Sequence, residues 1–441
     1  MQTWPRSATT ESLLSPEAVR SLVLEHVVPL LPVRVLLARS AGAVLAEPLV
    51  ARSDVPPFSN SAMDGFAVCA ADLASQSGRP HARARLRIAG RIAAGDATHA
   101  TLAPGQAWAI ATGAALPEGA DAVVRIEDAL VEGFPTAEGS WADGAWMEAA
   151  VGVPPGMNVR RRGEDVAAGD VLAEPGTPMG PGQLAAAAAA GVGSLLVHPR
   201  ASVAIVPTGD EVSPPGLPLV PGHVHDAVSI PLAALVEEAG GVPAPLPVVA
   251  DRPDAVQEAV RAAAGAHDLV LTIGGVSVGA RDFVGHNAGL PEIRSVRLAL
   301  RPARPFAFGR IGDAVVLCLP GNPGSALVAF EELVRPVVLA LAGRQPRARP
   351  SVTAVLAEPL VGKPGKVGVV PCKVWAEGPQ RPDGSIMLMA RQAGRGGPVS
   401  ALAEANAWAV LPADRPSVPA GSTIEVRLIS DVARGGNATA P

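Results

Sequence analysis

The sequence has 441 residues, 48% of them apolar, which is enough for about two to four domains with separate cores. Its 36 lysines and arginines against 41 aspartates and glutamates give a net charge of −5, which argues against a general nucleic-acid binder, because such proteins carry a basic excess. The three cysteines, Cys69, Cys318 and Cys372, are too far apart for a zinc motif or a disulfide framework. We therefore expect buried apolar thiols and a cytoplasmic location, and the lack of any apolar run of about 18 residues predicts no membrane span.

The first predicted element is a helix that begins at Pro16. Ser15 provides an N-cap, Pro16 takes the first helical position, and Glu17 places an acid in the first turn. From Asp54 to about Gly152 short apolar runs are interrupted by glycine, proline and aspartate. That pattern predicts a separate module of short β-strands.

From residue 202 onwards, buried β-branched runs alternate with amphipathic helices. We expect strands at 203–208, 245–249, 268–275 and 314–321, and helices at 230–241, 253–265 and 324–343. This alternation predicts a parallel, doubly wound α/β sheet. A linker rich in proline and arginine follows, and short alternating runs over 350–436 predict a small C-terminal β domain.

Polar or glycine-rich loops follow the expected strands of the α/β domain. Because ligands of open α/β sheets bind beyond the carboxyl ends of the strands, we expect these loops to share one rim. The loops are Thr208–Glu211, Asp251, Gly274–Asp282 and Pro320–Ser325.

The chemistry of this rim is coherent. Glycine-rich loops expose backbone N–H groups to phosphates. Three acids could hold Mg²⁺ with water and phosphate oxygens, namely Glu211, Asp251 and Asp282. Three arginines just before a strand could clamp anions, namely Arg297, Arg301 and Arg304. A metal, a phosphate cradle and guanidinium groups together favour phosphoryl or phosphoanhydride chemistry.

Each of these motifs has an ordinary structural interpretation when it is taken alone. A glycine-rich loop can be a tight turn, the PGNP segment can simply start a helix, and clustered arginines often form a solvated edge. No Walker-type G-x-x-x-x-G-K-[ST] motif occurs in the chain. The functional interpretation therefore depends on the joint position of the loops after successive strands.

The stretch PPFSNSAMDGFAV, residues 56–68, holds one carboxylate, Asp64, in a polar loop before a strand, and a turn alone does not explain that acid. With this stretch included, eight motifs match one family in order and span nearly the whole chain. The other seven are IATGAALPEGADAVVRIED (110–128), VRRRGEDVAAGDVL (159–172), VPTGDEV (206–212), LTIGGVSVGARDFV (271–284), RPARPFAFG (301–309), LPGNPGSALVAFE (319–331) and VSALAEANAWAVLP (399–412). The chain resembles the molybdopterin molybdenumtransferases, of the bacterial MoeA type and the gephyrin E domain.

The resemblance implies a multidomain α/β plus β fold whose central domain is of the molybdopterin-binding type and whose C-terminal domain is barrel-like. It implies domain I at 1–50 and 153–197, domain II at 51–152, domain III at 198–344 and domain IV at 345–441. It also implies an elongated homodimer with clefts shared between subunits. Beyond its small-molecule substrates, we expect other proteins of molybdenum cofactor biosynthesis, or cofactor acceptors, as partners, and neither nucleic acid nor membrane.

The activity implied by the resemblance is the last step of molybdenum cofactor biosynthesis. Molybdenum from molybdate enters the dithiolene of adenylylated molybdopterin, with Mg²⁺-dependent release of AMP. The implied catalytic residues are Asp64, Thr112, Asp165, Glu211, Asp251, Asp282, Arg297 and Arg301, of which Glu211, Asp251 and Asp282 would bind the metal. The implied substrate-binding residues are Gly274, Gly275, Ser277, Gly279, Arg304, Pro320, Asn322, Pro323, Ser325 and Ser400. Asp64 and Thr112 would reach the cleft from the partner subunit.

The chain departs from the family pattern at two places near the expected anion site. The family usually has lysines where this chain has its three rim arginines, which keeps the charge but changes its geometry. Pro371 and Cys372 stand where the family has an arginine on the molybdate side. Lys366, Lys373 or Arg391 are candidates to replace it, and a divergent paralogue or a preference for tungsten is an alternative.

Two other functions stay open at this point. Adenylylation of molybdopterin is one, because the α/β domain resembles molybdopterin adenylyltransferases, although these are single α/β domains. A non-catalytic binding or scaffold role is the other.

Overall fold

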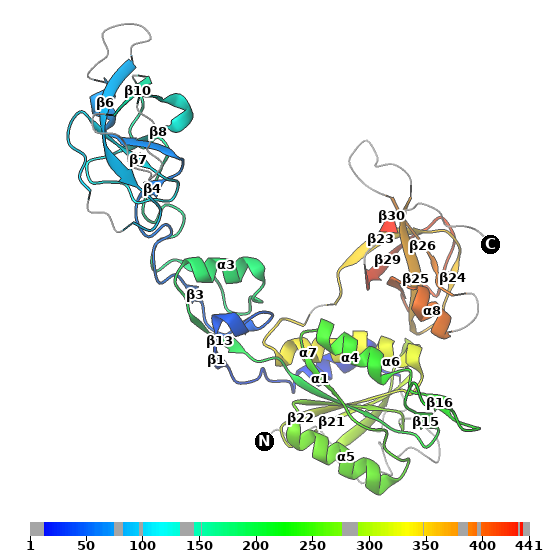
Figure 1. Ribbon diagram of the computed structural model, residues 1–441. Helices are drawn as coiled ribbons and strands as arrows, with labels where there is room; N and C mark the ends of the chain where they lie inside the picture. Colours follow the sequence, from blue (N-terminus) through cyan, green and yellow to red (C-terminus); the bar gives the residue numbers. More distant parts are fainter. Residues whose placement is uncertain are drawn as a thin grey trace.

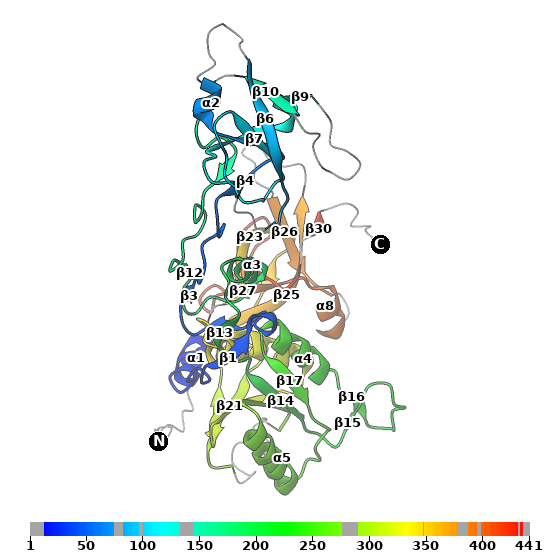
Figure 2. The same ribbon diagram turned by 60° about the vertical axis from the view of Figure 1, so that its left-hand side comes forward.

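The computed structural model describes residues 13–74, 83–96, 100–132, 145–150, 152–275, 290–346, 348–377, 387–394, 398–430 and 433–434. The molecule is elongated (Figures 1 and 2). An α/β part lies at one end, and a β-rich module lies at the far end in both views. A slender segment joins them, and a β-barrel sits next to the α/β part.

The α/β part is built on a six-stranded sheet. In sheet order its strands are β17 (Val242–Pro245), β14 (Ser202–Pro207), β18 (Leu269–Ile273), β22 (Ala314–Leu319), β21 (Pro305–Ile311) and β19 (Ile293–Arg297). The first four are parallel, β21 runs antiparallel to β22, and β19 runs antiparallel to β21. The central strands β14, β18 and β22 are apolar and buried almost throughout, as strands covered on both faces must be.

Helices cover both faces of this sheet, which confirms the predicted doubly wound fold. The helices are α1 (Pro16–Leu24), α4 (Ser229–Glu238), α5 (Pro253–Ala266), α6 (Pro323–Ala329) and α7 (Arg335–Leu341), with a π-helical turn η3 (Phe330–Val334) between the last two. One core contains Val236 of α4 and Val337 of α7, and the core on the opposite face contains Val256 and Val260 of α5. A small pair of strands, β15 (Val212–Ser213) and β16 (Val224–His225), projects from this part.

One expectation is corrected here. The strand expected at 245–249 lies earlier, at Val242–Pro245. The N–H groups of Leu246 and Val249 still donate to the carbonyls of Ile205 and Pro207, at 2.9 and 2.8 Å, but Pro247 between them has no N–H to donate, so the pairing past Pro245 is irregular.

The first helix begins at Pro16 with Ser15 as its cap, as predicted, and it packs on the α/β core. Its buried face, Val19 and Val23, explains this placement, because that face meets η3 and α7.

The β-rich module is a six-stranded sheet of short strands, as predicted. In sheet order they are β8 (Ala122–Arg125), β5 (Gly65–Val68), β7 (Gln106–Ile110), β6 (Arg83–Ile92), β10 (Trp146–Ala150) and β9 (Leu130–Glu132), with two short helices, α2 (Ala70–Ala74) and η2 (Ile126–Asp128). β6 alternates buried and exposed side chains along most of its length, because only one of its faces meets the core.

The connecting segment pairs the N-terminal part of the chain with the part that returns from the module. The elements are β1 (Val33–Leu36), η1 (Leu37–Arg39), β2 (Val44–Leu45), β3 (Leu49–Val50), β4 (Asn60–Ser61), β11 (Val159–Arg160), β12 (Val171–Ala173), α3 (Pro181–Ala189) and β13 (Ser194–His198). β13 lies between β1 and β2, β12 pairs with β3, and β11 pairs with β4. The module is thus an insertion carried on two antiparallel stretches of chain.

The C-terminal part is a closed barrel. Its elements are β23 (Ser351–Leu356), β24 (Leu360–Val361), β25 (Val367–Glu377), β26 (Met387–Gln392), α8 (Pro398–Glu404), β27 (Ala407–Leu411), β28 (Ser417–Val418), β29 (Thr423–Leu428) and β30 (Ala433–Arg434). The order β25-β26-β23-β29-β27 closes because β27 also pairs with β25. A short strand from the α/β part, β20 (Leu300–Arg301), adds to β25, so the two parts share hydrogen-bonded backbone.

None of the described helices is long and apolar enough to span a membrane. None of the three cysteines forms a disulfide. Cys318 and Cys372 are buried as expected, but Cys69 is only half-buried, which corrects the sequence-based prediction for that residue.

The cysteines should therefore differ in reactivity. Burial raises the pKa of the Cys372 thiol to about 12, which keeps the reactive thiolate scarce near neutral pH. We expect a thiol reagent to label Cys69 in the native protein, and Cys318 and Cys372 only after denaturation. Mass spectrometry of the labelled peptides checks this, and native labelling of Cys372 would contradict the packing described here.

Candidate active site

Three loops of the α/β part meet at the carboxyl ends of β14, β18 and β22. The N–H of Thr208 donates to the carbonyl of Ile273 at 2.9 Å, and the N–H of Gly274 donates to that of Leu319 at 3.0 Å. Gly274 has φ +92°, and a Cβ there would lie 3.0 Å from Thr208 Oγ1, so the loops approach too closely for a larger residue. The expected common rim is present for these loops.

The fourth loop joins the same rim through backbone contacts. The N–H of Gly209 donates to the carbonyl of Val249 at 3.1 Å, and the N–H of Asp251 donates to Asp210 Oδ1 at 3.1 Å. Asp251 therefore lies beside the loop that carries Glu211, which is exposed. The rim presents carboxylates at the end of β14.

The predicted metal site is only partly within the described residues. Asp282, Ser277 and Gly279 fall in 276–289, which lie outside them. Among the described residues, no group of three or more His, Cys, Asp or Glu side chains is arranged to hold a metal ion. The assignment of Glu211, Asp251 and Asp282 to a metal site therefore stays a prediction, because Asp282 lies outside the described residues.

The PGNP segment connects the end of β22 to α6. Pro320 is buried, and the Asn322 side chain caps the helix by accepting from the N–H of Ser325 at 3.4 Å. Pro323 takes the first helical position, as a proline commonly does. The PGNP segment is thus explained locally by the start of helix α6. In this position Asn322 is exposed at the rim.

The three rim arginines differ in their surroundings. Arg297 ends β19 and is half-buried, Arg301 lies in β20 opposite Gly368 of the barrel, and Arg304 is exposed just before β21. None of their side chains forms a salt bridge with another described residue. Their positive charges are therefore available to an anion.

A pocket of about 450 Å³ lies between the rim and the barrel. Arg301, Pro302, Asn322 and Gly324 line it from the α/β part. The barrel contributes Val361, Gly362, Gly368, Val369, Val370, Pro371, Gln392, Ala393, Gly394, Ala401, Leu402 and Trp408. Arg301 is the charged residue among those that line the pocket, so the pocket favours an anion on the α/β side.

The barrel side of the pocket carries no replacement for the missing arginine among the lining residues. Pro371 lines it, whereas Arg391 is turned to the carboxylate of Glu404, which also accepts from the N–H of Gly394 at 2.7 Å. The Gly394 N–H first, and then Arg391 and Lys373, lower the pKa of Glu404, so this acid stays ionised and retains Arg391. Lys366 is half-buried and outside the lining residues.

Ser400 also lies outside the pocket wall. It is exposed on α8, and the two following residues of that helix, Ala401 and Leu402, line the pocket in its place. Sequence analysis missed Gly394 and Trp408 as pocket residues. The sequence signal for Gly394 was a glycine placed directly after a strand. The structure explains it, because Gly394 has φ +74° and a Cβ there would lie 2.5 Å from the Ala401 Cα. Trp408 had no such signal, because it reads as an ordinary strand residue.

Asp64 and Thr112 lie together on the β-rich module. Asp64 Oδ1 accepts from the Thr112 N–H at 2.7 Å and from the Thr112 hydroxyl at 2.9 Å. Both residues are exposed, and the bond from the backbone N–H, followed by that from the hydroxyl, lowers the pKa of Asp64. The pair thus presents a fixed negative charge to the outside of the module.

Asp165 is placed beside the same loop by the returning chain. Its N–H donates to the carbonyl of Val55 at 3.1 Å, and its side chain is exposed. The neighbouring Arg162 forms an ion pair with Asp54, which ties 159–166 to the start of the PPFSNSAMDGFAV stretch. Asp64 and Thr112 belong to the β-rich module, which lies at the far end of the molecule from the α/β part (Figure 1).

Removing the Thr112 hydroxyl should raise the pKa of Asp64. In Thr112→Val the stronger backbone donor stays, so we expect the pKa to return only part of the way to its ordinary value. Because the folded-state pKa is depressed, the Asp64 contribution to stability is present above the unfolded pKa and is lost as pH falls through the folded value. An NMR titration of the Asp64 carboxyl carbon measures this, with Thr101→Val as the control; an unchanged pKa would exclude the hydroxyl as a cause.

Comparison with known proteins gives matches along most of the chain. Residues 14–191 match the family described as "MoeA N-terminal region (domain I and II)". Residues 204–340 match "Probable molybdopterin binding domain", and residues 353–429 match "MoeA C-terminal region (domain IV)". The three matches follow one another in a single order.

Relatives align over nearly full length. Molybdopterin molybdenumtransferase 2 of Mycobacterium tuberculosis is 34% identical over 342 residues, which cover 76% of this chain and 81% of that protein. Molybdopterin molybdenumtransferase of Synechococcus elongatus is 32% identical over 426 residues, which cover 94% of this chain and 99% of that protein. A solved structure of the MoeA molybdopterin biosynthesis protein from Pyrococcus horikoshii has a TM-score of 0.76 at 27% identity, with 95% of this chain and 100% of that chain covered.

Proposed function

The chain belongs to the MoeA family of molybdopterin molybdenumtransferases, and on that premise we propose that it transfers molybdenum from molybdate to adenylylated molybdopterin, with release of AMP. The observation that carries the proposal is the pocket between the rim and the barrel. It offers a guanidinium, Arg301, and the exposed amide of Asn322 next to neutral barrel residues. Such a pocket suits a small oxyanion held against a larger, partly apolar pterin.

The roles of the described residues follow from their positions. Arg301 attracts negative charge on molybdate or on the phosphates, and its planar fork can donate two hydrogen bonds to one oxyanion. Gly274 allows the backbone of the rim to approach a diphosphate closely. Asn322 can donate from its amide group to the pterin or to an oxyanion, while its oxygen caps α6. Water adds across the phosphoanhydride bond, which breaks to release AMP and leave the phosphate of molybdopterin. Molybdate loses one oxygen as water, which takes the two protons of the dithiol, while the molybdenum forms bonds to both dithiolene sulfurs, so the oxidation state of the metal does not change.

The donor chemistry of the rim fits Mg²⁺. Carboxylate oxygens are the ligands that magnesium prefers, and the exposed Glu211 and the adjacent Asp251 supply them at the end of β14. Together with Asp282, these residues would hold the ion, which when bound would neutralise the diphosphate charge.

We further propose that the enzyme works in the cytoplasm as a homodimer in which the module of one subunit completes the cleft of the other. The support for a shared cleft is that the module that carries the Asp64–Thr112 pair lies far from the α/β part of its own chain (Figure 1). Among the described residues, no hydrogen bond or ion pair links this fixed carboxylate to the rim of its own chain. A neighbouring subunit could use it as a polar wall of the cleft.

Turnover with defined substrates tests the proposal. Purified protein is mixed with adenylylated molybdopterin, Mg²⁺ and molybdate, and AMP is measured by chromatography. We expect AMP release that depends on both molybdate and Mg²⁺. Stable binding of the pterin without AMP release would favour the scaffold alternative, and AMP attachment to free molybdopterin with ATP would favour adenylyl transfer.

A further inference from the structure

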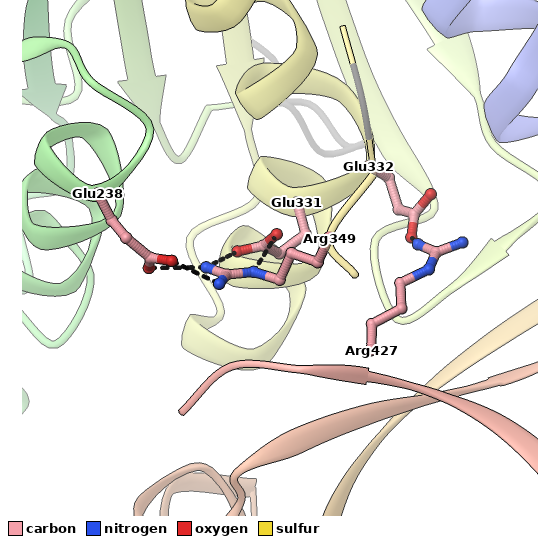
Figure 3. A network of polar contacts seen from close by, with 5 residues as sticks. All are labelled: Glu238, Glu331, Glu332, Arg349 and Arg427. Atoms are coloured by element: carbon pink, nitrogen blue, oxygen red, sulfur yellow. Dashed lines mark hydrogen bonds and ion pairs between the residues drawn. The ribbon is translucent and has the colours of Figure 1, made fainter. Parts of the chain in front are cut away.

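The π-helical turn η3 places two adjacent acids in the interior, Glu331 and Glu332 (Figure 3). They are 9% and 4% exposed, and neighbouring residues of a helical turn point in different directions. Each therefore takes its own arginine partner. Buried carboxylates demand such partners, because an unpaired buried charge is strongly destabilising.

Glu331 binds the linker that leads into the barrel. Arg349, two residues before β23, donates to both oxygens of Glu331 at 2.8 Å and to those of Glu238 at 2.5 and 2.7 Å. Two bidentate contacts to one guanidinium fix its plane as well as its position. The entry of the chain into the barrel is thus anchored to α4 and η3.

Glu332 binds the barrel itself. Its carboxylate forms an ion pair with Arg427 of β29, and a longer one, at 3.5 Å, with Arg20 of α1 (Figure 3 shows the first pair). Arg427 stands directly opposite Trp408 in the β27–β29 ladder. Trp408 is 4% exposed, packs in the core of the α/β part and lines the pocket.

From this chain of contacts we infer that Glu332 is a positioning residue, which acts through Arg427 and Trp408 to set how the barrel sits on the α/β part and hence the width of the pocket. The β20–β25 pairing joins the two parts at the residues around Arg301 and Gly368. The barrel therefore stays attached when the ion pair is lost, and the pair controls its angle about that joint. The catalytic consequence rests on the proposed function, whereas the geometric one does not.

The two arginine partners of Glu332 provide a matched comparison. Arg427→Gln removes the ion pair between the barrel and Glu332 but leaves Glu332 paired with Arg20. Arg20→Gln removes a partner of the same acid from α1, which already belongs to the α/β part. A general loss of stability would appear in both variants, whereas a loss of barrel positioning would appear only in Arg427→Gln.

The geometry can be measured without turnover. Spin labels are attached to Glu258→Cys on α5 and Asp414→Cys in the turn after β27, both exposed positions, in a Cys69→Ser background. The labelled protein is diluted with unlabelled protein, and pulsed electron-spin resonance gives the distance distribution. We expect Arg427→Gln and Glu332→Gln to shift or broaden it, Arg20→Gln to leave it unchanged, and the Glu332→Gln/Arg427→Gln double variant to match the single variants. Identical distributions in all variants, each shown to be folded by circular dichroism, would overturn the inference.

The kinetic readout separates positioning from loss of folded enzyme. A wider pocket should raise the KM for molybdate by about tenfold in Arg427→Gln with kcat changed much less, since ligand contacts are misplaced. Loss of folded enzyme would lower kcat and leave KM unchanged, which would overturn the catalytic role. A wild-type protein without activity would refute the proposed function, while the distance distributions would still decide the positioning role.

Discussion

Arg301→Ala should lower kcat/KM for AMP release in the presence of molybdate by about 100-fold. The residue lines the pocket, and its guanidinium forms no salt bridge among the described residues. We therefore expect its positive charge to interact with a bound anion. Removing one preorganised group that stabilises developing negative charge typically costs between about 100- and 1000-fold. Among the described residues of the barrel side, none that lines the pocket is a second cation, and Arg391 is held by Glu404.

The measurement is a steady-state series in which molybdate and adenylylated molybdopterin are varied separately. Arg310→Ala is the matched control, because it removes a guanidinium from the same part of the chain. Among the described residues, Arg310 pairs with the exposed Asp313 and the carbonyl of Gly312. Arg301→Lys should retain part of the activity, since the charge remains while the planar fork is lost. Equal kinetics in Arg301→Ala and the wild type would exclude this residue from anion binding.

Mixing two inactive variants should restore activity if the cleft is shared. Asp64→Ala damages the module side of each cleft and Asp282→Ala damages the α/β side, so each homodimer has two broken clefts. A mixed dimer has one cleft with both changes and one with neither. At equal amounts and random exchange half of the dimers are mixed, so we expect about one quarter of the wild-type activity.

The control uses two changes on the same side of the cleft. Asp64 and Thr112 are hydrogen-bonded on one module, so mixing Asp64→Ala with Thr112→Ala rebuilds no intact cleft. We expect no recovery in that mixture. Absence of recovery with Asp64→Ala and Asp282→Ala, under conditions in which subunits are shown to exchange, would count against the shared cleft.

Several features were predictable because they depend on neighbours in the chain. The start of α1 at Pro16 follows from its cap, and the buried strands β14, β18 and β22 follow from continuous apolar runs. The meeting of the rim loops also followed, because parallel strands end at one edge of a sheet. The edge strand β17 was misplaced because the apolar run continues past Pro245, where Leu246 and Val249 still donate to β14 but no regular strand forms.

Other features depend on segments that are distant in sequence, and local patterns carry little information about them. The packing of α1 on the α/β core, the pairing of β20 with β25 and the position of Trp408 in the pocket are of this kind. The same holds for Arg391, whose side chain is directed by Glu404 and Gly394. The position of Arg391 in the sequence therefore did not predict whether its side chain faces the pocket.

By itself, the sequence determined the family and the alternation of β-rich and α/β parts. It also supplied most of the candidate site residues, because motifs and periodicity are local properties of a chain. The tertiary structure alone decided which of those residues share a pocket. It grouped Arg301 and Asn322 with the barrel, left Asp64 and Thr112 on the far module, and paired two adjacent glutamates with arginines from two other regions. The physical reason is that burial and charge pairing are settled between segments far apart in the chain, where a buried carboxylate needs a cation and an exposed one does not.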